Sequence, residues 1–559
     1  MKANSGVRQN KTRKKTQKET RIGIAQIDST LGDFKTNKTK ILEAILKADD
    51  RKCSMVVFPE CALFGYHPFD MLERTDLIEY QNRAFSEIVK KIPKDMAVIF
   101  GLLTINEKKK GRPYFNSAVL LIRGKKPKFF NKQLLPTGDV FDEARFVEPG
   151  DLTKNYFTWK GARFFLTICE DIWGWPNPKG YSAYKENPLS KVPKQKVDLV
   201  INLSASPFHL GKMQAREYMT RQTASYFKAP LLYVNLVGAQ DEIIFDGTSF
   251  LMSRRGRRIF SCESFREDFN VFDLKTHKHW SAARALPDIE KLRRALVLGI
   301  QDFCRKVGID RVHLGLSGGI DSALVSCLAV DALGSRNVRG IGIPGPHSSP
   351  ESLTLARQLS ERLGIEFSEI SINSTYQTVI EALAKNFDHR QFSIVNENVQ
   401  ARLRGLFLMA YANQNQSLLL TTGNKSEYAT GYATLYGDMC GGLAPIGDLT
   451  KKQVYQLAEL YNSQHEVIPP EIIKRAPTAE LRPNQKDQDT LPPYEVLDES
   501  VERLVTRSKM GKTTTDKWLS KVLMKTEFKR WQAAPILKVS EHSFGRGRRW
   551  PVAHKAWIY

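Results

Sequence analysis

Apolar and polar residues alternate along the chain in a pattern that predicts a regular succession of strands and helices. Short apolar runs bounded by polar residues are typical of buried strands. In the first half they predict strands at residues 21–28, 55–58, 97–103, 118–122, 164–169 and 199–203. Residues 37–47 carry apolar side chains at helical spacing and predict a helix. Strands and helices in this alternation are typical of an α/β sandwich.

The pattern changes beyond a polar break near residues 281–287. Strands are predicted at 312–317, 338–343 and 417–421, and helices at 320–333 and 351–363. Repeated strand–loop–helix units predict a doubly wound parallel α/β sheet, whose ligands collect at the carboxyl ends of the strands. The chain beyond Pro477 is polar and basic and contains several prolines, which predicts loops over a site and a short helical tail.

These patterns divide the chain into three parts. Residues 1–20 are expected to form a basic disordered arm, residues 21–280 a first α/β domain, and residues 281–559 a second domain with a C-terminal tail. A length of 559 residues fits this division, because one hydrophobic core rarely serves so long a chain. His277 and His279 in the polar break have no further metal ligand nearby, so a loop is favoured there over a metal site.

The composition is that of a soluble globular protein, with 42% hydrophobic and 26% charged residues. No apolar run is long enough to cross a bilayer, and the lysine-rich N-terminus has no apolar run before Ile22. We therefore expect a protein without a membrane partner. A cytoplasmic location is favoured over the alternative of a mitochondrial transit peptide, because the N-terminal segment lacks a clear amphipathic face. The seven cysteines are scattered and contain no Cys-x-x-Cys pair, which argues against a disulfide framework and a zinc cluster.

The formal net charge of +24 permits two kinds of partner. Much of the charge lies in residues 2–18 and 503–555, and such a surface attracts nucleic acids as well as nucleotide phosphates. The sequence contains no helix-turn-helix, zinc-finger or aromatic RNA-binding signature. A solvated basic surface and small-molecule ligands are therefore favoured over nucleic acid. A nucleic-acid-binding protein built on a degenerate enzyme remains the alternative.

Three residues at predicted strand ends suggest an amidase in the first domain. Glu60 follows the strand at 55–58, Cys169 ends the strand at 164–169, and Lys132 lies between them in sequence. A thiolate attacks a carboxamide, a carboxylate moves protons, and an ammonium stabilises the oxyanion of the tetrahedral intermediate. The positive charge of Lys132 is also expected to lower the pKa of the thiol.

Taken in this order, the three segments resemble the nitrilase, or carbon–nitrogen hydrolase, superfamily. The resemblance implies an α/β/β/α sandwich in which Glu60 is the general base, Lys132 stabilises the oxyanion and Cys169 is the nucleophile. Residues 202–208 resemble the glutamine-binding stretch of the subgroup that is fused to NAD synthetases. The residues that the resemblance places around glutamine are Tyr66, Phe141, Glu143, Glu170 and Ser206.

One departure from this subgroup lies beside the predicted pocket. Where its members commonly read Asn-Tyr-Gly, this chain has Thr137, Gly138 and Asp139. An aromatic pocket residue is therefore missing. We expect the reaction type to persist, whereas the affinity for glutamine and the coupling between the two domains are open to change.

Residues 316–322, Leu-Ser-Gly-Gly-Ile-Asp-Ser, are the most informative segment of the second half. They follow a predicted strand and open a predicted helix, where backbone N–H groups and the helix dipole receive phosphates. The segment lacks the Gly-Lys-Thr/Ser of a Walker A loop, and its acid favours a magnesium–pyrophosphate complex. A second glycine pattern, at 340–345, falls within a predicted strand with no helix directly after it, so a Rossmann dinucleotide site is rejected there.

The Ser-Gly-Gly-x-Asp-Ser segment resembles the N-type ATP pyrophosphatases, a superfamily with a Rossmann-like fold. Residues 421–427 and 431–438 resemble the marks of NAD synthetases, and residues 398–404 and 477–483 also fit that family. The ATP-binding residues implied by this resemblance are Ser317, Gly318, Gly319, Ile320, Asp321, Ser322, Thr422 and Lys451. The residues implied for deamido-NAD are Asn398, Glu427, Tyr432, Thr434 and Lys538. Asp321 and Glu427 are the implied Mg²⁺ ligands.

Both resemblances together imply a carbon–nitrogen ligase that uses glutamine as its nitrogen donor. Its expected reaction is the ATP-dependent amidation of deamido-NAD to NAD through an adenylate, with ammonia from glutamine hydrolysis. AMP, pyrophosphate and glutamate are the other products. The resemblance also implies a homo-oligomer. Another ATP-pyrophosphatase amidotransferase is the alternative within the enzyme class, and formation of AMP that depends on deamido-NAD separates the two.

Overall fold

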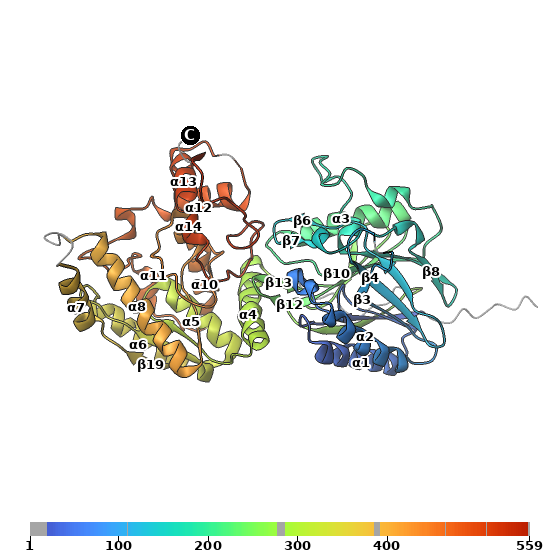
Figure 1. Cartoon of the computed structure of the whole chain (residues 1–559), viewed down its shortest axis with the longest axis horizontal. Helices are drawn as coiled ribbons and strands as arrows, with labels where there is room; N and C mark the ends of the chain where they lie inside the picture. The colour runs from blue at the N-terminus through green and yellow to red at the C-terminus, as the bar shows by residue number, and fades with distance from the viewer. Residues whose placement is uncertain are drawn as a thin grey trace, which may run out of the picture.

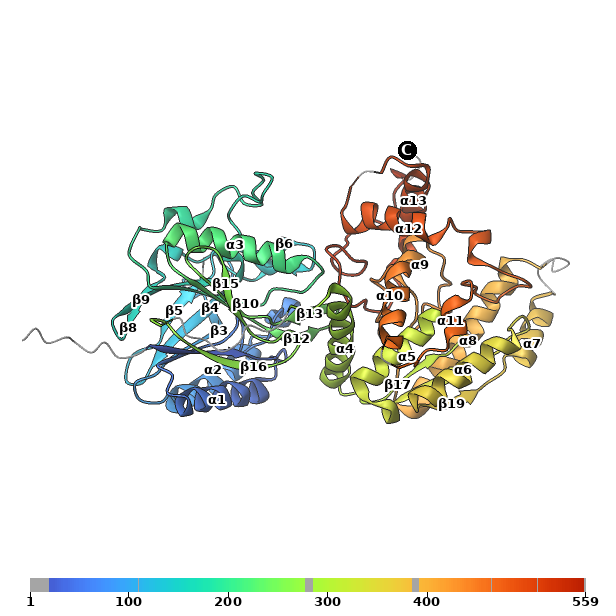
Figure 2. The ribbon, with the colours of Figure 1, turned by 180° about the vertical axis from the view of Figure 1, so that it is seen from behind.

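A computed structural model describes residues 20–108, 110–276, 285–384, 392–463, 465–509 and 511–556. The chain folds into two lobes with helix α4 (Asp288–Val307) between them, as Figures 1 and 2 show from opposite sides. Residues 277–284, which hold most of the predicted break together with His277 and His279, lie outside the described ranges, as does the arm up to residue 19. Among the described residues, no helix is both long and apolar enough to cross a membrane.

Two six-stranded sheets form the centre of the N-terminal lobe. In spatial order the first contains β16 (Asp268–Asp273), β1 (Arg21–Gln26), β2 (Met55–Val57), β3 (Ala97–Ile105), β4 (Tyr114–Ile122) and β5 (Lys128–Asn131). The second contains β15 (Arg258–Ser261), β14 (Phe250–Met252), β11 (Leu231–Asn235), β10 (Leu199–Ser204), β9 (Ala162–Ile168) and β8 (Tyr156–Trp159). Each strand predicted in this half is present, shortened or lengthened by a few residues at its ends.

Successive side chains of a strand in this lobe pack into two different cores, one on each face of the sheet. Met55 and Val57 belong to the core between the two sheets, whereas Val56 belongs to the core beneath α1 (Phe34–Asp50) and α2 (Asp76–Lys90). Successive side chains of a strand point to opposite faces, so a strand covered on both faces is apolar throughout. Helix α3 (Lys212–Phe227) covers the outer face of the second sheet. The expected α/β/β/α sandwich is confirmed.

The C-terminal lobe contains a four-stranded parallel sheet in the order β19 (Glu366–Glu369), β18 (Val338–Gly342), β17 (Val312–Gly315) and β20 (Leu418–Leu419). Helices α5 (Ile320–Leu333) and α6 (Pro350–Leu363) connect β17, β18 and β19 in turn. The chain then crosses back to β20 through α7 (Asn373–Ala384) and α8 (Ile394–Asn415). Because such crossovers are right-handed, the reversal of direction places α8 on the opposite face from α5, as a doubly wound sheet requires.

Two sequence predictions for this lobe need correction. The strand expected at 417–421 is limited to the two residues of β20. The region beyond Pro477 is more helical than a short tail, with α12 (Tyr494–Val501), α13 (Thr514–Lys525) and α14 (Glu527–Arg530). Leu497, Val501 and Leu519 are buried in one cluster with α9 (Lys425–Thr430), but the many basic residues around them mask their helical spacing in the sequence. The remaining helices are α10 (Lys451–Asn462) and α11 (Pro470–Lys474).

The two lobes share an apolar core at α4. This helix packs on the hairpin of β12 (Val237–Gln240) and β13 (Ile243–Asp246), and Ala239 and Ile244 lie in the same buried cluster as Leu292 and Leu296. Polar contacts surround this core. Lys306 Nζ is 2.9 Å from Asp28 Oδ1, and Ala239 N donates to Asp302 Oδ2 at 2.7 Å. The lobes therefore contact each other through a packed interface.

Candidate active sites

The N-terminal lobe holds a buried charged cluster at the ends of its central strands. Lys132 follows β5, and its Nζ lies 2.8 Å from Glu60 Oε1 and 2.6 Å from Glu143 Oε2. The side chains of Lys132 and Glu60 are fully buried. Glu60 lies shortly after β2, beyond Phe58 and Pro59, as its position after an apolar run predicted. The structure thus brings together two of the three predicted catalytic residues, and Glu143 with them.

Hydrogen bonds fix the orientation of both carboxylates. Asn116 Nδ2 donates to Glu60 Oε1 at 2.7 Å and to Glu143 Oε1 at 2.5 Å, and Ala205 N donates to Glu60 Oε2 at 2.8 Å. Burial raises the pKa of Glu60, an effect that Lys132 opposes and Glu143 strengthens. For Lys132, burial by itself would lower the pKa, but Glu143 and Glu60 hold it well above its usual value. An ammonium beside a carboxylate of raised pKa suits oxyanion stabilisation beside a general base.

Cys169 lies at the turn that follows β9, where a short 3₁₀ helix, Cys169–Ile172, begins. Its φ of 40° is left-handed, a strained backbone conformation that is often found at functional sites. Burial raises the pKa of this thiol well above its ordinary value, Glu60 adds to the rise, and Lys132 opposes it. Lys132 thus acts on the pKa of the thiol in the expected direction, but burial and Glu60 outweigh it in the resting site. The thiol has to lose its proton to a base when it reacts.

Asp171 ties the turn of Cys169 to the segment after Lys132. Its Oδ1 accepts hydrogen bonds from Gln133 N at 2.8 Å and Leu134 N at 3.0 Å, and its Oδ2 accepts one from Ile168 N at 2.8 Å. These bonds hold the turn of Cys169 and the segment after Lys132 together. The sequence showed two acids after Cys169 but gave no signal for this role, since the donors are backbone groups far apart along the chain.

The residues expected around glutamine surround this cluster. Lys132 Nζ is 5.9 Å from the centroid of the Tyr66 ring, and the centroids of Tyr66 and Phe141 are 6.5 Å apart. Glu170 accepts a hydrogen bond of 2.7 Å from the Tyr184 hydroxyl, and burial raises its pKa. Ser206 is buried in the loop after β10.

Two basic residues of α3 complete this side of the site and were not predicted. Arg216 is fully buried, donates to Asp246 Oδ1 at 2.8 Å and to Ser206 O at 2.7 Å, and so fixes the loop of Ser206. Lys212 Nζ is 4.3 Å from the centroid of the Trp173 ring, and burial lowers its pKa while Glu170 and Cys169 raise it. A cation near Cys169 is a ready partner for a substrate carboxylate. Its position at the start of the helix after residues 202–208 was the available signal.

The segment that departs from related sequences forms a small hairpin at the edge of this site. Strands β6 (Thr137–Gly138) and β7 (Phe141–Asp142) pair in it, and Asp139 at its tip has a φ of 47°. Gly138 is exposed, and a Cβ atom added to it would have no atom within 4 Å. The space next to Gly138 is therefore open, and this chain has no side chain there to fill it.

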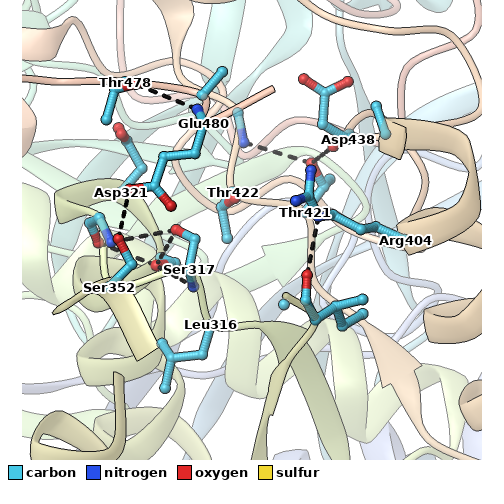
Figure 3. Close-up of a pocket in the computed structure, with 18 of the residues that line it drawn as sticks. Leu316, Ser317, Asp321, Ser352, Arg404, Thr421, Thr422, Asp438, Thr478 and Glu480 are labelled. Carbon is cyan, nitrogen blue, oxygen red and sulfur yellow. Dashed lines mark hydrogen bonds between the residues drawn. The ribbon is translucent and has the colours of Figure 1, made fainter. Parts of the chain in front are cut away.

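The C-terminal lobe holds a cavity of about 320 Å³ at the carboxyl ends of its strands. Residues 317–322 form one wall, as Figure 3 shows for Ser317 and Asp321. Gly318 has a φ of 74°, and a Cβ atom there would lie 2.2 Å from Ser352 O, so only glycine fits. The loop leads into the N-terminus of α5, where free N–H groups and the helix dipole attract phosphate. The cavity is of the size that small-molecule ligands occupy.

Asp321, Lys451 and Glu427 meet beside this loop. Lys451 Nζ is 2.5 Å from Asp321 Oδ2 and 3.7 Å from Glu427 Oε1, and Asn424 Nδ2 donates to Asp321 Oδ1 at 2.9 Å. Burial raises the pKa of Glu427 to about 8, and the neighbouring Asp321 adds to the rise. Thr422 also lines the cavity, so the predicted ATP-binding residues are brought together.

The lining of the cavity also contains charged residues that were not predicted. Arg475 Nη2 donates to Glu480 Oε1 at 2.5 Å, and Ser352 Oγ donates to the same oxygen at 2.7 Å. Arg404 reaches into the cavity from α8 and donates to Ile343 O at 3.1 Å. Arg404 and Glu480 lie inside the segments 398–404 and 477–483, so the sequence marked the segments but not these side chains.

The residues expected to bind deamido-NAD separate into two places. Tyr432 lines the cavity, and Thr434 Oγ1 donates to Asn398 Oδ1 at 2.9 Å nearby. Lys538 is not brought to this group. Its Nζ donates to Ser540 O and Glu541 O and lies 3.4 Å from Asp139 Oδ2, beside the other active site. The physical reason is the path of the tail, which after Leu537 runs between the lobes and bonds to Asp448 of its own lobe and to Glu242 of the other.

The two sites define a fused enzyme, in which an amidase of the nitrilase fold is joined to an ATP-using ligase of the pyrophosphatase fold. Residues 21–278 match the carbon–nitrogen hydrolase family, and residues 292–533 match the NAD synthase family. The chain is 41% identical to the glutamine-dependent NAD(+) synthetase of Synechocystis sp., with 95% of this chain and 98% of that relative covered. The chain belongs to the family of glutamine-dependent NAD(+) synthetases.

Further relatives agree with this assignment. The glutamine-dependent NAD(+) synthetase of Thermotoga maritima is 36% identical, with 96% of this chain and 99% of the relative covered. Among solved structures, that of the glutamine-dependent NAD⁺ synthetase from Acinetobacter baumannii in complex with ADP has a TM-score of 0.75 and 32% identity. It covers 96% of this chain and 98% of the solved chain. Both lobes are thus shared with these enzymes.

Proposed function

We propose that this chain makes NAD from deamido-NAD, ATP and glutamine, with AMP, pyrophosphate and glutamate as the other products. The observation that carries the proposal is the presence of two complete sites in one chain. One holds Cys169 with the buried cluster of Glu60 and Lys132, and the other holds the 317–322 loop with Asp321 and Lys451. A hydrolysis site and an ATP site joined by a packed interface fit the transfer of nitrogen from one to the other.

In the proposed glutaminase reaction, Glu60 takes the proton of the Cys169 thiol, and the sulfur attacks the carboxamide carbon of glutamine. Lys132 stabilises the resulting oxyanion, and Glu60 returns the proton to the departing ammonia. Water then attacks the thioester, which frees glutamate and the thiol. Tyr66, Phe141, Glu143, Glu170 and Ser206 form the proposed glutamine pocket. Lys212 supplies the cation that pairs with the α-carboxylate of the substrate.

In the proposed synthetase reaction, the carboxylate of deamido-NAD attacks the α-phosphorus of ATP and pyrophosphate leaves. Ammonia then attacks the activated carbonyl carbon and displaces AMP. The backbone N–H groups of residues 317–322 and the Lys451 ammonium bind the phosphates and stabilise the charge that develops on pyrophosphate. Asn398, Tyr432 and Thr434 are proposed to bind deamido-NAD.

The oxygen ligands near the loop fit Mg²⁺. Asp321 and Glu427 lie together beside Lys451, and burial, strengthened by Asp321, raises the pKa of Glu427 to about 8, so a cation bound between the two carboxyl groups would displace the Glu427 proton. In the described part of the chain, no three acidic, histidine or cysteine side chains form a complete metal site. Two carboxylates completed by phosphate oxygens are the arrangement that Mg²⁺ commonly adopts with nucleotides. Bound there by Asp321 and Glu427, the ion would neutralise charge on the pyrophosphate group.

A direct assay tests the proposed function. Purified protein is incubated with deamido-NAD, ATP and Mg²⁺, with either glutamine or ammonium as nitrogen source, and NAD and AMP are measured. Both nitrogen sources are expected to yield NAD and AMP in equal amounts. AMP formation without any need for deamido-NAD would instead favour a different ATP-pyrophosphatase amidotransferase. Absence of NAD with either source would refute the proposal.

The rate of glutamine hydrolysis is expected to fall in acid. Glu60 must be a carboxylate to accept the thiol proton, and burial raises its pKa above the ordinary value of 4.5. Protonation as the pH drops therefore removes the base, and kcat/KM for glutamate release decreases by up to about tenfold for each pH unit below that pKa. Glutamate release measured between pH 5 and 9 checks this. A rate that stays constant down to pH 5 would contradict the raised pKa of Glu60.

We further propose that residues 21–280 and 281–559 are the two domains, that the protein is cytoplasmic, and that it is a homo-oligomer. Helix α8 supports the last point. Its apolar residues Ile394, Leu406 and Met409 are 64%, 61% and 41% exposed in the single chain. Apolar side chains gathered on one exposed helix are typical of a protein interface.

Light scattering on the purified protein tests the oligomeric state. A homo-oligomer has a mass that is a multiple of the 63.5 kDa of one chain. The variant Leu406→Glu places a charge in the proposed interface and is expected to shift the mass to that of one chain. Leu46→Glu, at an exposed leucine of α1 in the other lobe, is the matched control and should leave the mass unchanged. A wild-type mass of 63.5 kDa would refute the homo-oligomer.

A further inference from the structure

Residues 173–187, here called the tyrosine loop, leave the turn of Cys169 and contact it again through one side chain. The Tyr184 hydroxyl donates a hydrogen bond of 2.7 Å to Glu170 Oε1. Glu170 directly follows Cys169 in the short 3₁₀ helix of that turn. The tyrosine loop therefore reaches the carboxylate beside the proposed nucleophile, from a part of the chain in which the sequence marked no site residue.

Contacts at both ends of the tyrosine loop hold it against the N-terminal lobe. Near its start, Trp175 Nε1 donates to Thr223 Oγ1 of α3 at 2.9 Å. Just beyond its end, Leu189 is fully buried in the apolar cluster beneath α3. Within the loop, Ser182 Oγ donates to Tyr184 O at 2.9 Å and accepts a hydrogen bond from Tyr184 N at 3.3 Å. A side chain presented by a loop fixed in this way loses little conformational freedom when a ligand binds.

The Glu170 carboxylate is partly removed from water but has no cation in contact with it. Among the residues that the structure describes, Tyr184 is the one hydrogen-bond donor to this carboxylate, and no ion pair reaches it. Glu170 is half-buried, and burial raises its pKa, whereas the bond from Tyr184 and the more distant Lys132 and Lys212 lower it. A carboxylate in such surroundings gains most from a cation that arrives with the ligand.

Lys212 is the charge that complements Glu170. Burial lowers the pKa of Lys212 and Arg216 adds to the fall, whereas Glu170 opposes it. The two charges thus act on each other, yet in the described ranges they form no ion pair together. A carboxylate and an ammonium that are partly desolvated and held apart are the arrangement that a zwitterion completes. Free α-amino acids carry this pair of charges, and simple amides do not.

We propose that Tyr184 is a positioning residue that makes the glutaminase site selective for α-amino acid amides. Its hydroxyl holds one oxygen of Glu170, so that the other oxygen is available to the α-ammonium group of glutamine, while Lys212 holds the α-carboxylate. An amide without the amino group leaves Glu170 desolvated and unpaired, and the site therefore rejects it. The inference rests on the proposed glutaminase reaction.

The test compares two substrates of the full chain, glutamine and glutaramate, which is glutamine without its α-amino group. Ammonia release is measured for both, and the wild-type protein is expected to favour glutamine by about 10²-fold in kcat/KM. Tyr184→Phe keeps the ring and removes only the hydroxyl that bonds to Glu170. Because a hydrogen bond to a charged group supports about a tenfold difference in binding, KM for glutamine should rise about tenfold with kcat little changed. For glutaramate, kcat/KM should stay within about twofold of wild type, since this amide does not use Glu170.

Glu170→Gln shows whether Tyr184 acts through Glu170. This variant keeps the shape of the side chain without its charge, and its preference for glutamine over glutaramate should fall below about tenfold. Adding Tyr184→Phe to it should change little, since both substitutions affect one interaction.

Tyr181→Phe is the matched control, because it makes the same substitution in the same loop at a side chain that is 71% exposed. Both amides should be hydrolysed within about twofold of the wild-type rate in this variant. NAD formation from ammonium should also stay within about twofold of wild type in every variant, because the cavity of the other lobe is unchanged.

The results separate this inference from the proposed function. An equal loss with both amides in Tyr184→Phe would overturn the inference, since it would indicate a general structural role of the loop, and an unchanged KM for glutamine would overturn it as well. Effects of Tyr184→Phe and Glu170→Gln that add fully in the double variant would show that Tyr184 does not act through Glu170. Failure of the wild-type protein to make NAD from ammonium would refute the proposed function, but ammonia release from the two amides would still decide the role of Tyr184.

Discussion

Replacement of Cys169 by alanine is expected to abolish NAD formation from glutamine while NAD formation from ammonium continues. The thiol is the only group in the proposed mechanism that forms a bond to glutamine, and loss of a covalent nucleophile costs about 10³-fold or more in rate. The ammonium reaction needs only the cavity of the C-terminal lobe. Rates with each nitrogen source, measured for wild type and Cys169→Ala side by side, give the comparison.

Cys53→Ala is the matched control for this experiment. Cys53 is also a buried thiol of the N-terminal lobe, but it lies in the core beneath α1, away from Glu60 and Lys132. Both nitrogen sources should support near wild-type NAD formation in this variant. If Cys169→Ala still used glutamine at the wild-type rate, the nucleophile would have to be reassigned. If it lost the ammonium reaction as well, the two sites would not function separately.

The second large effect is expected for Asp321→Asn, which should prevent NAD formation from either nitrogen source. Asp321 lies in the phosphate-binding loop, 2.5 Å from Lys451, and is proposed to hold Mg²⁺ with Glu427. Loss of a group that stabilises transition-state charge costs about 10²- to 10³-fold in kcat. The amide keeps the size of the side chain and can still bond to Asn424. NAD formation and the ATP–pyrophosphate exchange rate are the two measurements.

Glutamate release should persist in Asp321→Asn, because the glutaminase cluster is in the other lobe. Asp331→Asn is the control on the same helix, where the aspartate accepts a hydrogen bond from Tyr461 at 2.7 Å and does not line the cavity. Normal NAD formation by Asp321→Asn, or an equal loss in Asp331→Asn, would remove Asp321 from the phosphate site.

The succession of strands along the chain was predictable, and so were the strand ends that carry the candidate catalytic residues. Both depend on local sequence patterns. An apolar run followed by Glu60, and another ended by Cys169, identify strand ends regardless of the remaining fold. The helix at 320–333 was predicted with the bounds that α5 has, since the two glycines of the loop and Gly334 mark its ends. Where polar residues obscured the apolar spacing, as in α12 and α13, the prediction was incomplete.

Contacts within the sites were less accessible to prediction. Ala205 and Glu60 are 145 positions apart in sequence, yet the N–H of one orients the carboxylate of the other. Asn116 joins the two carboxylates of the cluster, and nothing in the residues around it marks that role. The pKa of Cys169 illustrates the same limit. The sequence suggested a charge effect of Lys132, but burial determined the direction.

The sequence by itself determined the fold class, the family and the residue types of both sites, because these depend on periodicity and on motifs a few residues long. Only the tertiary structure decided how the sites are connected. The tail of the C-terminal lobe contacts both lobes at their boundary, so Lys538 meets Asp139 and not the nucleotide cavity. That pairing joins residues about 400 positions apart, and no local pattern encodes it. It follows from the packing of α4 against β12 and β13, which places the two lobes side by side.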